Sequence, residues 1–224
     1  MDARLLRLMG ASLVSLPLIT GYAAGGWGGW AAITVGELPD FLVTRHPTQL
    51  TFTVRQHGVH PLDGLKPTVE ATSGKLTVAA AATPGAGAGQ YAATLTPSEP
   101  GEWTITIHSG FNTASVTLLP VQAIAPGARP PAPLADAERG RRLFVAKGCV
   151  SCHLHRAVNP NGGGVGPELT GKHFAADFLT KFLADPAAVI PPRPGSATMP
   201  NLALKPLEIS ALIAFINTEQ LSLP

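Results

Sequence analysis

Residues 149–153 read Cys-Val-Ser-Cys-His, and this short stretch decides how the second half of the chain is expected to fold. The chain of 224 residues contains no cysteine besides Cys149 and Cys152, so a framework of disulfides is excluded. The two thiols are three positions apart and lie on one tight turn, and His153 directly follows the second. We therefore expect these three side chains to act together on a single group.

The pattern C-x-x-C-H indicates covalent attachment of a c-type haem. Two thiols on one turn reach the two vinyl groups at one edge of a porphyrin, and the adjacent imidazole then points at the iron. A thioredoxin-like pair would require a βαβ setting, and a zinc site would require further cysteine or histidine ligands at short spacing. A structural disulfide across so short a loop would stabilise little. The sequence predicts one covalent haem c on Cys149, Cys152 and His153.

The first 24 residues have the three parts of a secretory signal peptide. Arg4 and Arg7 supply positive charge, an uncharged apolar run follows, and small residues end it. The uncharged stretch is also long enough to cross a bilayer if it is retained. We favour cleavage near Ala23 or Ala24, because the following GGWGGW is a poor helix former. Residues 1–24 are thus predicted to be a signal peptide or a membrane anchor. The rest of the chain is placed in the periplasm or on the outer face of the cytoplasmic membrane.

Residues 25–119 show the alternation that is typical of β-strands. Short runs rich in β-branched and aromatic residues are separated by turn-forming pieces. The runs are residues 30–35, 49–56, 67–71, 75–82, 90–95, 102–109 and 114–119. In the sixth run Trp103, Ile105 and Ile107 alternate with polar residues, so one face is expected to be buried and the other solvated. This pattern predicts an all-β sandwich.

A proline-rich segment, residues 120–135, separates the strand pattern from a helical one. Proline-rich chain acts as a semi-rigid spacer, so we expect a linker between two domains here. Residues 136–224 then form a small domain with helical periodicity. Its core is thin, and a large buried cofactor would stabilise it.

Three amphipathic helices are expected in this second domain. They span residues 136–148, 173–185 and 206–220. Asp136 is the expected N-cap of the first helix, and Pro206 suits the first turn of the third. The expected apolar stripe of the third helix consists of Leu207, Ala211, Leu212, Phe215 and Ile216. A loop is expected between the second and third helices.

Residues 135–221 resemble the class I c-type cytochromes. That family opens with a helix that carries a glycine and an aromatic residue four positions apart, here Gly140 and Phe144. The C-x-x-C-H motif is followed by a GPxLxG segment, here residues 166–171, and a late loop holds a Met–Pro pair, here beginning at Met199. The resemblance implies an all-α cytochrome c domain in which the last helix packs across the first.

The resemblance also implies the iron ligands. His153 would be the proximal ligand and Met199 the distal one, while the carbonyl of Pro167 would accept a hydrogen bond from the other ring nitrogen of His153. Independently, Met199 is the only methionine after the signal-like segment, and it lies in a loop of proline and glycine rather than on an apolar helical face. Of the other candidates, His155 is too near His153 to reach the opposite haem face, and His173 is expected on the surface.

Filled axial positions leave no open site for oxygen or peroxide, which favours electron transfer over catalysis, so the chain is not expected to be an enzyme. The leading hypothesis is a carrier of single electrons to or from a respiratory-chain partner: a terminal oxidase, a bc-type complex or a reductase. Alternatives are an obligate haem c subunit of a membrane oxidase or dehydrogenase complex, and a haem-based sensor or metal-handling protein.

A net charge of +2 without a Lys/Arg run gives no indication of nucleic-acid binding. Lys147, Lys172 and Lys181 are expected to form a modest positive rim around the haem edge.

The strand-rich domain is similar to the YtkA-like, immunoglobulin-type domains of exported bacterial proteins. The similarity rests on its GW start, the VRQHG turn and the GEWTITIH strand. It implies an immunoglobulin-like sandwich, but it implies no particular activity for this domain. We expect a docking module or spacer. His46, His57, His60 and His108 suggest copper. They lie in different loops and strands with no cysteine or methionine, so we expect surface or turn histidines.

Overall fold

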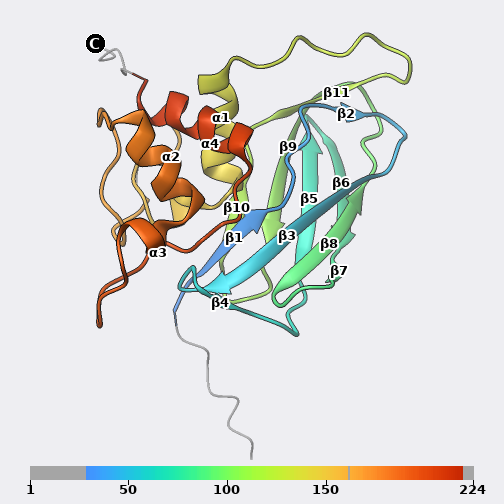
Figure 1. Cartoon of the computed structure of the whole chain (residues 1–224). Coiled ribbons are helices and arrows are strands. Elements are labelled where there is room, and N and C mark those ends of the chain that lie inside the picture. Colours follow the sequence, from blue (N-terminus) through green and yellow to red (C-terminus); the bar gives the residue numbers. More distant parts are fainter. Residues whose placement is uncertain (1–28, 161, 219–224) are drawn as a thin grey trace, which may run out of the picture.

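The structure is a computed structural model that describes residues 29–160 and 162–218. Figure 1 shows a β-sandwich beside a group of helices, and this confirms the predicted order of an all-β sandwich followed by a helical domain. The expected signal peptide or anchor, residues 1–24, lies outside the described residues. Among the residues that are described, no helix combines the length and the apolar character that a membrane span requires.

The sandwich consists of two sheets packed face to face (Figure 1). One sheet has the strand order β1-β3-β8-β7 with β4 paired to β3, and the other has the order β2-β11-β9-β5-β6 with β10 paired to β9. All seven predicted runs form strands. The strands are β1 (Ala31–Val35), β2 (Leu42–Val43), β3 (Thr48–Gln56), β4 (His60–Pro61), β5 (Thr68–Ser73), β6 (Leu76–Ala81), β7 (Thr83–Pro84), β8 (Gln90–Leu95), β9 (Gly101–His108), β10 (Ser115–Thr117) and β11 (Val121–Ile124).

The sandwich core follows the predicted alternation. Trp103, Ile105 and Ile107 of β9 are at most 1% exposed, whereas the residues between them are only partly covered. The hydroxyl of Tyr91 donates a hydrogen bond to the carbonyl of Leu62 at 2.7 Å, so this large side chain is buried without losing its polar contact. One face of each central strand therefore supplies the core.

The predicted linker, residues 120–135, is wrong in its first part. Val121–Ile124 form β11, which pairs antiparallel with β9 and parallel with β2. The reason is that these four residues contain no proline and that apolar and polar or exposed positions alternate along them. Val121 and Ala123 are fully buried, while Gln122 is exposed. Residues 125–135, which follow this strand, form neither helix nor strand.

The second domain, as far as its residues are described, contains four α-helices and one 3₁₀ turn. These are α1 (Asp136–Ala146), η1 (Cys149–Ser151), α2 (Ala176–Ala184), α3 (Pro186–Val189) and α4 (Pro206–Ile216). Asp136 is the first helical residue rather than the N-cap, and the cap position, Ala135, makes no side-chain bond. The short α3 lies in the predicted loop, where Pro186 fits the first turn and the Asp185 carboxylate accepts a bond from the N–H of Ala188.

The first and last helices cross closely at Gly140. A Cβ at this glycine would lie 1.9 Å from the carbonyl oxygen of Ala211, so the two backbones meet without a side chain between them. The rings of Phe144 and Phe215 pack edge to face 5.5 Å apart. The predicted crossing is thus confirmed. Leu207, which was expected in the apolar stripe, is 82% exposed because it lies one turn before the crossing.

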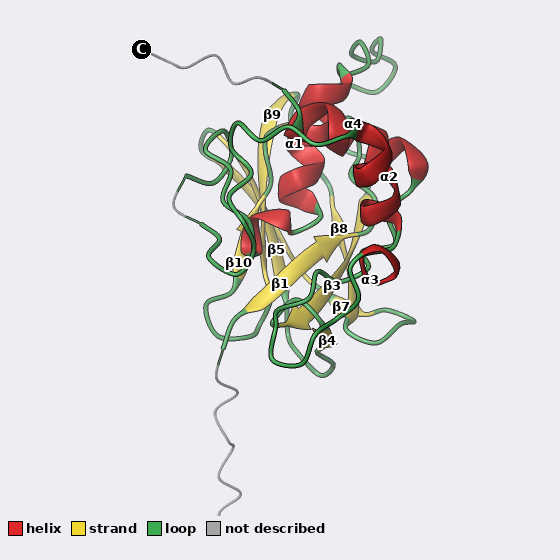
Figure 2. Cartoon of the chain, turned by 60° about the vertical axis from the view of Figure 1, so that its left-hand side comes forward, coloured by secondary structure: helices red, strands yellow, loops and turns green. Residues whose placement is uncertain are grey.

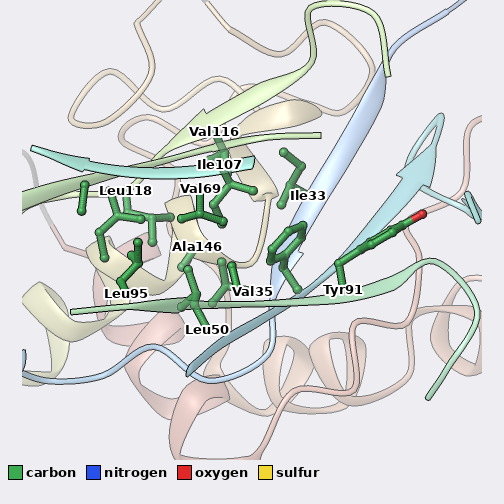
Figure 3. Packing of buried hydrophobic residues seen from close by; sticks show 14 of the residues in the cluster. Ile33, Val35, Leu50, Val69, Tyr91, Leu95, Ile107, Val116, Leu118 and Ala146 are labelled. Carbon is green, nitrogen blue, oxygen red and sulfur yellow. The ribbon is translucent and has the colours of Figure 1, made fainter. Parts of the chain in front are cut away.

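Helix α1 joins the two cores. Its side chains Leu143 and Phe144 belong to the core of the helical domain, whereas Val145 and Ala146 belong to the core of the sandwich. Figure 3 shows Ala146 among the buried side chains of the strands. Strand β1 lies on the side of the sandwich nearest to the helices (Figures 1 and 2). The end of α1, where the C-x-x-C-H motif begins, is therefore held between the domains.

Candidate functional site

The C-x-x-C-H segment is folded into a tight turn directly after α1. Gly148 ends the helix with φ of 78°, a left-handed conformation that favours glycine. The N–H groups of Cys152 and His153 then both donate to the carbonyl oxygen of Cys149, at 3.1 and 2.8 Å. This turn brings both thiols and the imidazole to the wall of one cavity.

The surroundings of the two thiols differ from those of an activated redox pair. They are not joined in a disulfide. Burial raises the pKa of Cys149 to about 12, and burial also raises the pKa of Cys152. A reactive C-x-x-C pair has a lowered thiol pKa. The burial of these thiols therefore does not favour the thioredoxin-like alternative.

The imidazole of His153 is fixed by the segment that follows. Its Nδ1 lies 2.9 Å from the carbonyl oxygen of Pro167. A carbonyl only accepts, so Nδ1 carries the proton and Nε2 keeps the lone pair that a metal ligand needs. Gly166 lies against the ring, since a Cβ there would be 2.4 Å from Cε1, and its N–H donates to the carbonyl of Cys152 at 2.9 Å. The GPxLxG pattern alone did not indicate this contact of Gly166.

The cavity has a volume of about 530 Å³, which is within the range of pockets that hold small molecules and cofactors. Apolar side chains from α1, α2 and α4 dominate its lining, among them Phe144, Leu179, Leu183, Leu212 and Ile216. Met199 also lines it and packs against the helical core. Both thiols, an imidazole with a free Nε2 and a thioether thus border one apolar cavity, and this donor set fits a c-type haem.

The loop that carries Met199 is held by a residue that sequence analysis missed. The side-chain N–H of Asn201 donates to the carbonyl of Ala184 at the end of α2, at 3.2 Å. Its side-chain oxygen accepts from the N–H of Ala203 at 2.9 Å. The available signal was the asparagine itself, because Asn side chains often bond to backbone two residues on.

The other histidines of the second domain lie away from the cavity wall. His155 is 1% exposed, and its ring contacts Phe144 and Phe215 at centroid distances of 5.6 and 4.3 Å. Burial lowers its pKa. His155 is therefore a core residue between α1 and α4. His173 is exposed, as expected.

The predicted rim of lysines is wrong for Lys147, which is only 4% exposed. Its Nζ donates to the carbonyl of Gly36 at 2.6 Å and forms an ion pair with Glu208 at 2.8 Å. The reason is that Lys147 follows the buried end of α1, where the sandwich covers it. Lys172 and Lys181 are exposed.

The histidines of the sandwich do not gather. His57 lies in the turn after β3, with its ring 5.9 Å from that of Trp30, whereas His60 begins β4 and His108 ends β9. Within residues 29–160 and 162–218, no cluster of three or more His, Cys, Asp or Glu side chains has the geometry of a metal site.

Comparison with known proteins bears on both domains. Residues 137–220 match the family model described as Cytochrome c. No match was found among curated proteins. Among solved structures, the filamin domain of Lin-41 has 19% identity and a TM-score of 0.33, and the alignment covers 42% of this chain and 90% of that one. The C-terminal domain of ZirS has 10% identity and a TM-score of 0.32, with 55% and 87% covered. Domains 4 and 5 of the S-layer protein SbsC have 19% identity and a TM-score of 0.30, with 42% and 51% covered.

The family match spans the helices and the motif that border the cavity. It agrees with the donor set found there and with the close crossing of α1 and α4. A cytochrome c domain implies a haem-binding protein that transfers electrons. The chain therefore consists of an N-terminal β-sandwich followed, at residues 137–220, by a domain of the cytochrome c family.

Proposed function

We propose that this chain is an exported cytochrome with one covalent haem c, which carries single electrons to or from a respiratory-chain partner such as a terminal oxidase, a bc-type complex or a reductase. One observation carries the proposal. Cys149, Cys152, His153 and Met199 border the same apolar cavity, and the His153 ring is fixed with its Nε2 lone pair available. No other arrangement in the described residues brings thiols, imidazole and thioether together.

Each residue of this set has a separate task. Cys149 and Cys152 would attach the haem by thioether links, which would keep a large cofactor in a small domain. His153 would supply one iron ligand, and its bond to Pro167 holds the ring in a fixed orientation. Met199, which lines the same cavity, would supply the other ligand. A haem with His/Met ligation supplies reversible one-electron chemistry at a raised potential.

The surroundings favour electron transfer over catalysis. Two protein ligands leave no iron position for a substrate. The side chains of the lining that belong to the helical core are apolar, which favours a bound porphyrin over water at that wall.

Export is supported by the sequence of residues 1–24, with its positive start, apolar run and small-residue end. Covalent haem attachment also takes place outside the cytoplasm. We propose that the mature chain is periplasmic or held at the outer face of the cytoplasmic membrane.

The test is expression in a host that is competent for covalent haem attachment, followed by mass spectrometry and a haemochrome spectrum. The expected mature protein is red and carries the mass of one haem, and the double variant Cys149→Ala, Cys152→Ala carries none. A colourless wild-type protein with only the polypeptide mass would contradict the proposal. Purification then separates a carrier, which is isolated alone, from an obligate subunit, which is isolated with its partners.

A further inference from the structure

Strand β1 is buried on both of its faces, although it lies at the edge of its sheet. In the described part of the chain it pairs with β3 alone, yet all five of its residues are buried. Ile33 and Val35 belong to the sandwich core, whereas Ala32 and Thr34 line the cavity of the cytochrome domain. The outer face of an antiparallel sheet is commonly solvated. Here the second domain takes the place of water.

The sandwich also contacts the haem-attachment segment itself. A Cβ on Gly148, directly before the first cysteine, would lie 2.6 Å from the carbonyl oxygen of Ile33. In the turn between β3 and β4, a Cβ on Gly58 would lie 4.0 Å from the Sγ of Cys152 and 3.5 Å from the ring of Trp30. Backbone of the sandwich therefore approaches the side of the cavity where both thiols lie.

Lys147 holds the two domains in this position. Its Nζ donates to the carbonyl of Gly36, which directly follows β1, and it forms an ion pair with Glu208 in the first turn of α4. The side chains of Lys147 and Glu208 are only 4% and 14% exposed. Arg139 forms an ion pair with Asp40 at 2.9 Å and adds an outer contact between the domains.

We propose that the sandwich is a wall of the haem site: β1 and the turn at residues 57–60 close the side of the cavity next to Cys149 and Cys152, and Lys147 fixes this wall. This inference rests on the proposed haem binding and replaces the expected role of a tethered spacer. The wall keeps water from that edge of the haem. It also forces redox partners to approach by another side of the cytochrome domain.

The test compares the haem-loaded wild type with Lys147→Met by hydrogen exchange and by redox titration. The unpaired N–H groups of an edge strand are protected only by what covers them. Because the variant leaves the buried Glu208 carboxylate and the Gly36 carbonyl without their cation, we expect exchange in β1 and in residues 57–60 to accelerate on the order of 100-fold. We also expect the midpoint potential to fall, because an uncompensated carboxylate and entering water both favour the oxidised haem.

The matched control is Lys75→Met, which removes the same charge from an exposed position in the turn between β5 and β6 and should leave both measurements unchanged. The inference is overturned if the folded Lys147→Met variant has the amide exchange rates and the midpoint potential of the wild type. If that variant does not fold, the Glu208→Gln variant provides the test, because glutamine keeps the size of the side chain and one acceptor oxygen. Its β1 exchange should rise on the order of tenfold, and unchanged exchange would overturn the wall.

The two proposals fail in different ways. A wild-type protein without haem would contradict the proposed function, whereas the exchange comparison tests the contacts of Lys147 and can also be made on a haem-free chain. If the amide hydrogens of β1 exchange rapidly in the haem-loaded wild type, only the proposed wall is contradicted.

Discussion

Gly166 lies so close to the imidazole of His153 that a Cβ at this glycine would be 2.4 Å from Cε1 and 2.6 Å from Nδ1. The same ring is held at its edge by the carbonyl of Pro167, 2.9 Å from Nδ1. Consecutive residues of the GPxLxG segment thus fix both the position and the tautomer of His153. Glycine is required at position 166 because the backbone there approaches the ring too closely to leave room for a side chain.

Gly166→Ala is expected to push the imidazole out of its ligating position. Overpacking of this kind costs about 1–3 kcal/mol of unfolding free energy, and the displaced ligand should also change the midpoint potential and the visible spectrum. Urea unfolding and redox titration measure the two effects. Gly171→Ala is the control: it has φ of 64° but open space around its Cβ, so it should lower stability without changing the spectrum.

Met199→Ala tests the distal ligand. We expect the weak near-infrared band that arises from sulfur-to-iron charge transfer to vanish and the midpoint potential to fall, because thioether ligation raises a haem potential. The control His173→Ala replaces an exposed side chain and should change neither. An unchanged spectrum of the Met199 variant would exclude this residue as the ligand.

The local parts of the site could be predicted from the sequence because their geometry is set within a few residues. The turn at Cys149 follows from its motif, and the burial of Trp103, Ile105 and Ile107 follows from strand alternation. The short β11 was missed because the prolines on either side of Val121–Ile124 concealed four alternating residues.

The contact between the domains could not be predicted in the same way. Lys147 and Gly36 are 111 positions apart, and a lysine after a helix is ordinarily solvated. Only β1 carried a signal: its sequence AAITV has small or apolar side chains on both faces, as expected for a strand that is covered twice.

Gly140→Ala is expected to separate α1 from α4. The new Cβ would lie 1.9 Å from the carbonyl oxygen of Ala211, and backbone cannot yield as a flexible side chain does. The loss in unfolding free energy should therefore reach at least the upper part of the usual overpacking range, about 3 kcal/mol. Thermal unfolding followed by circular dichroism measures it. Ser210→Ala, on the exposed side of α4, is the control, and an equal melting temperature for both variants would contradict the close crossing.

Glu138 should make stability depend on acid pH. Hydrogen bonds from Arg141 and then Arg142 lower the pKa of Glu138 below its usual 4.5, and Arg142 in turn donates to the carbonyl of Pro120 at 2.6 Å. The folded chain therefore favours the carboxylate. Its contribution is present above pH 4.5 and is lost as the pH falls through the lowered pKa.

The size of this effect is limited because the Glu138 side chain is 34% exposed, and solvent screening keeps the contribution below about 1 kcal/mol. Glu138→Gln should lower the unfolding free energy at neutral pH and reduce its decline toward about pH 3, as measured by urea unfolding at both values. Asp177→Asn, an exposed carboxylate in the first turn of α2, is the control and should keep the wild-type decline. If the stability of Glu138→Gln declined as steeply as that of the wild type, the bonds from the two arginines would not stabilise the Glu138 carboxylate in solution.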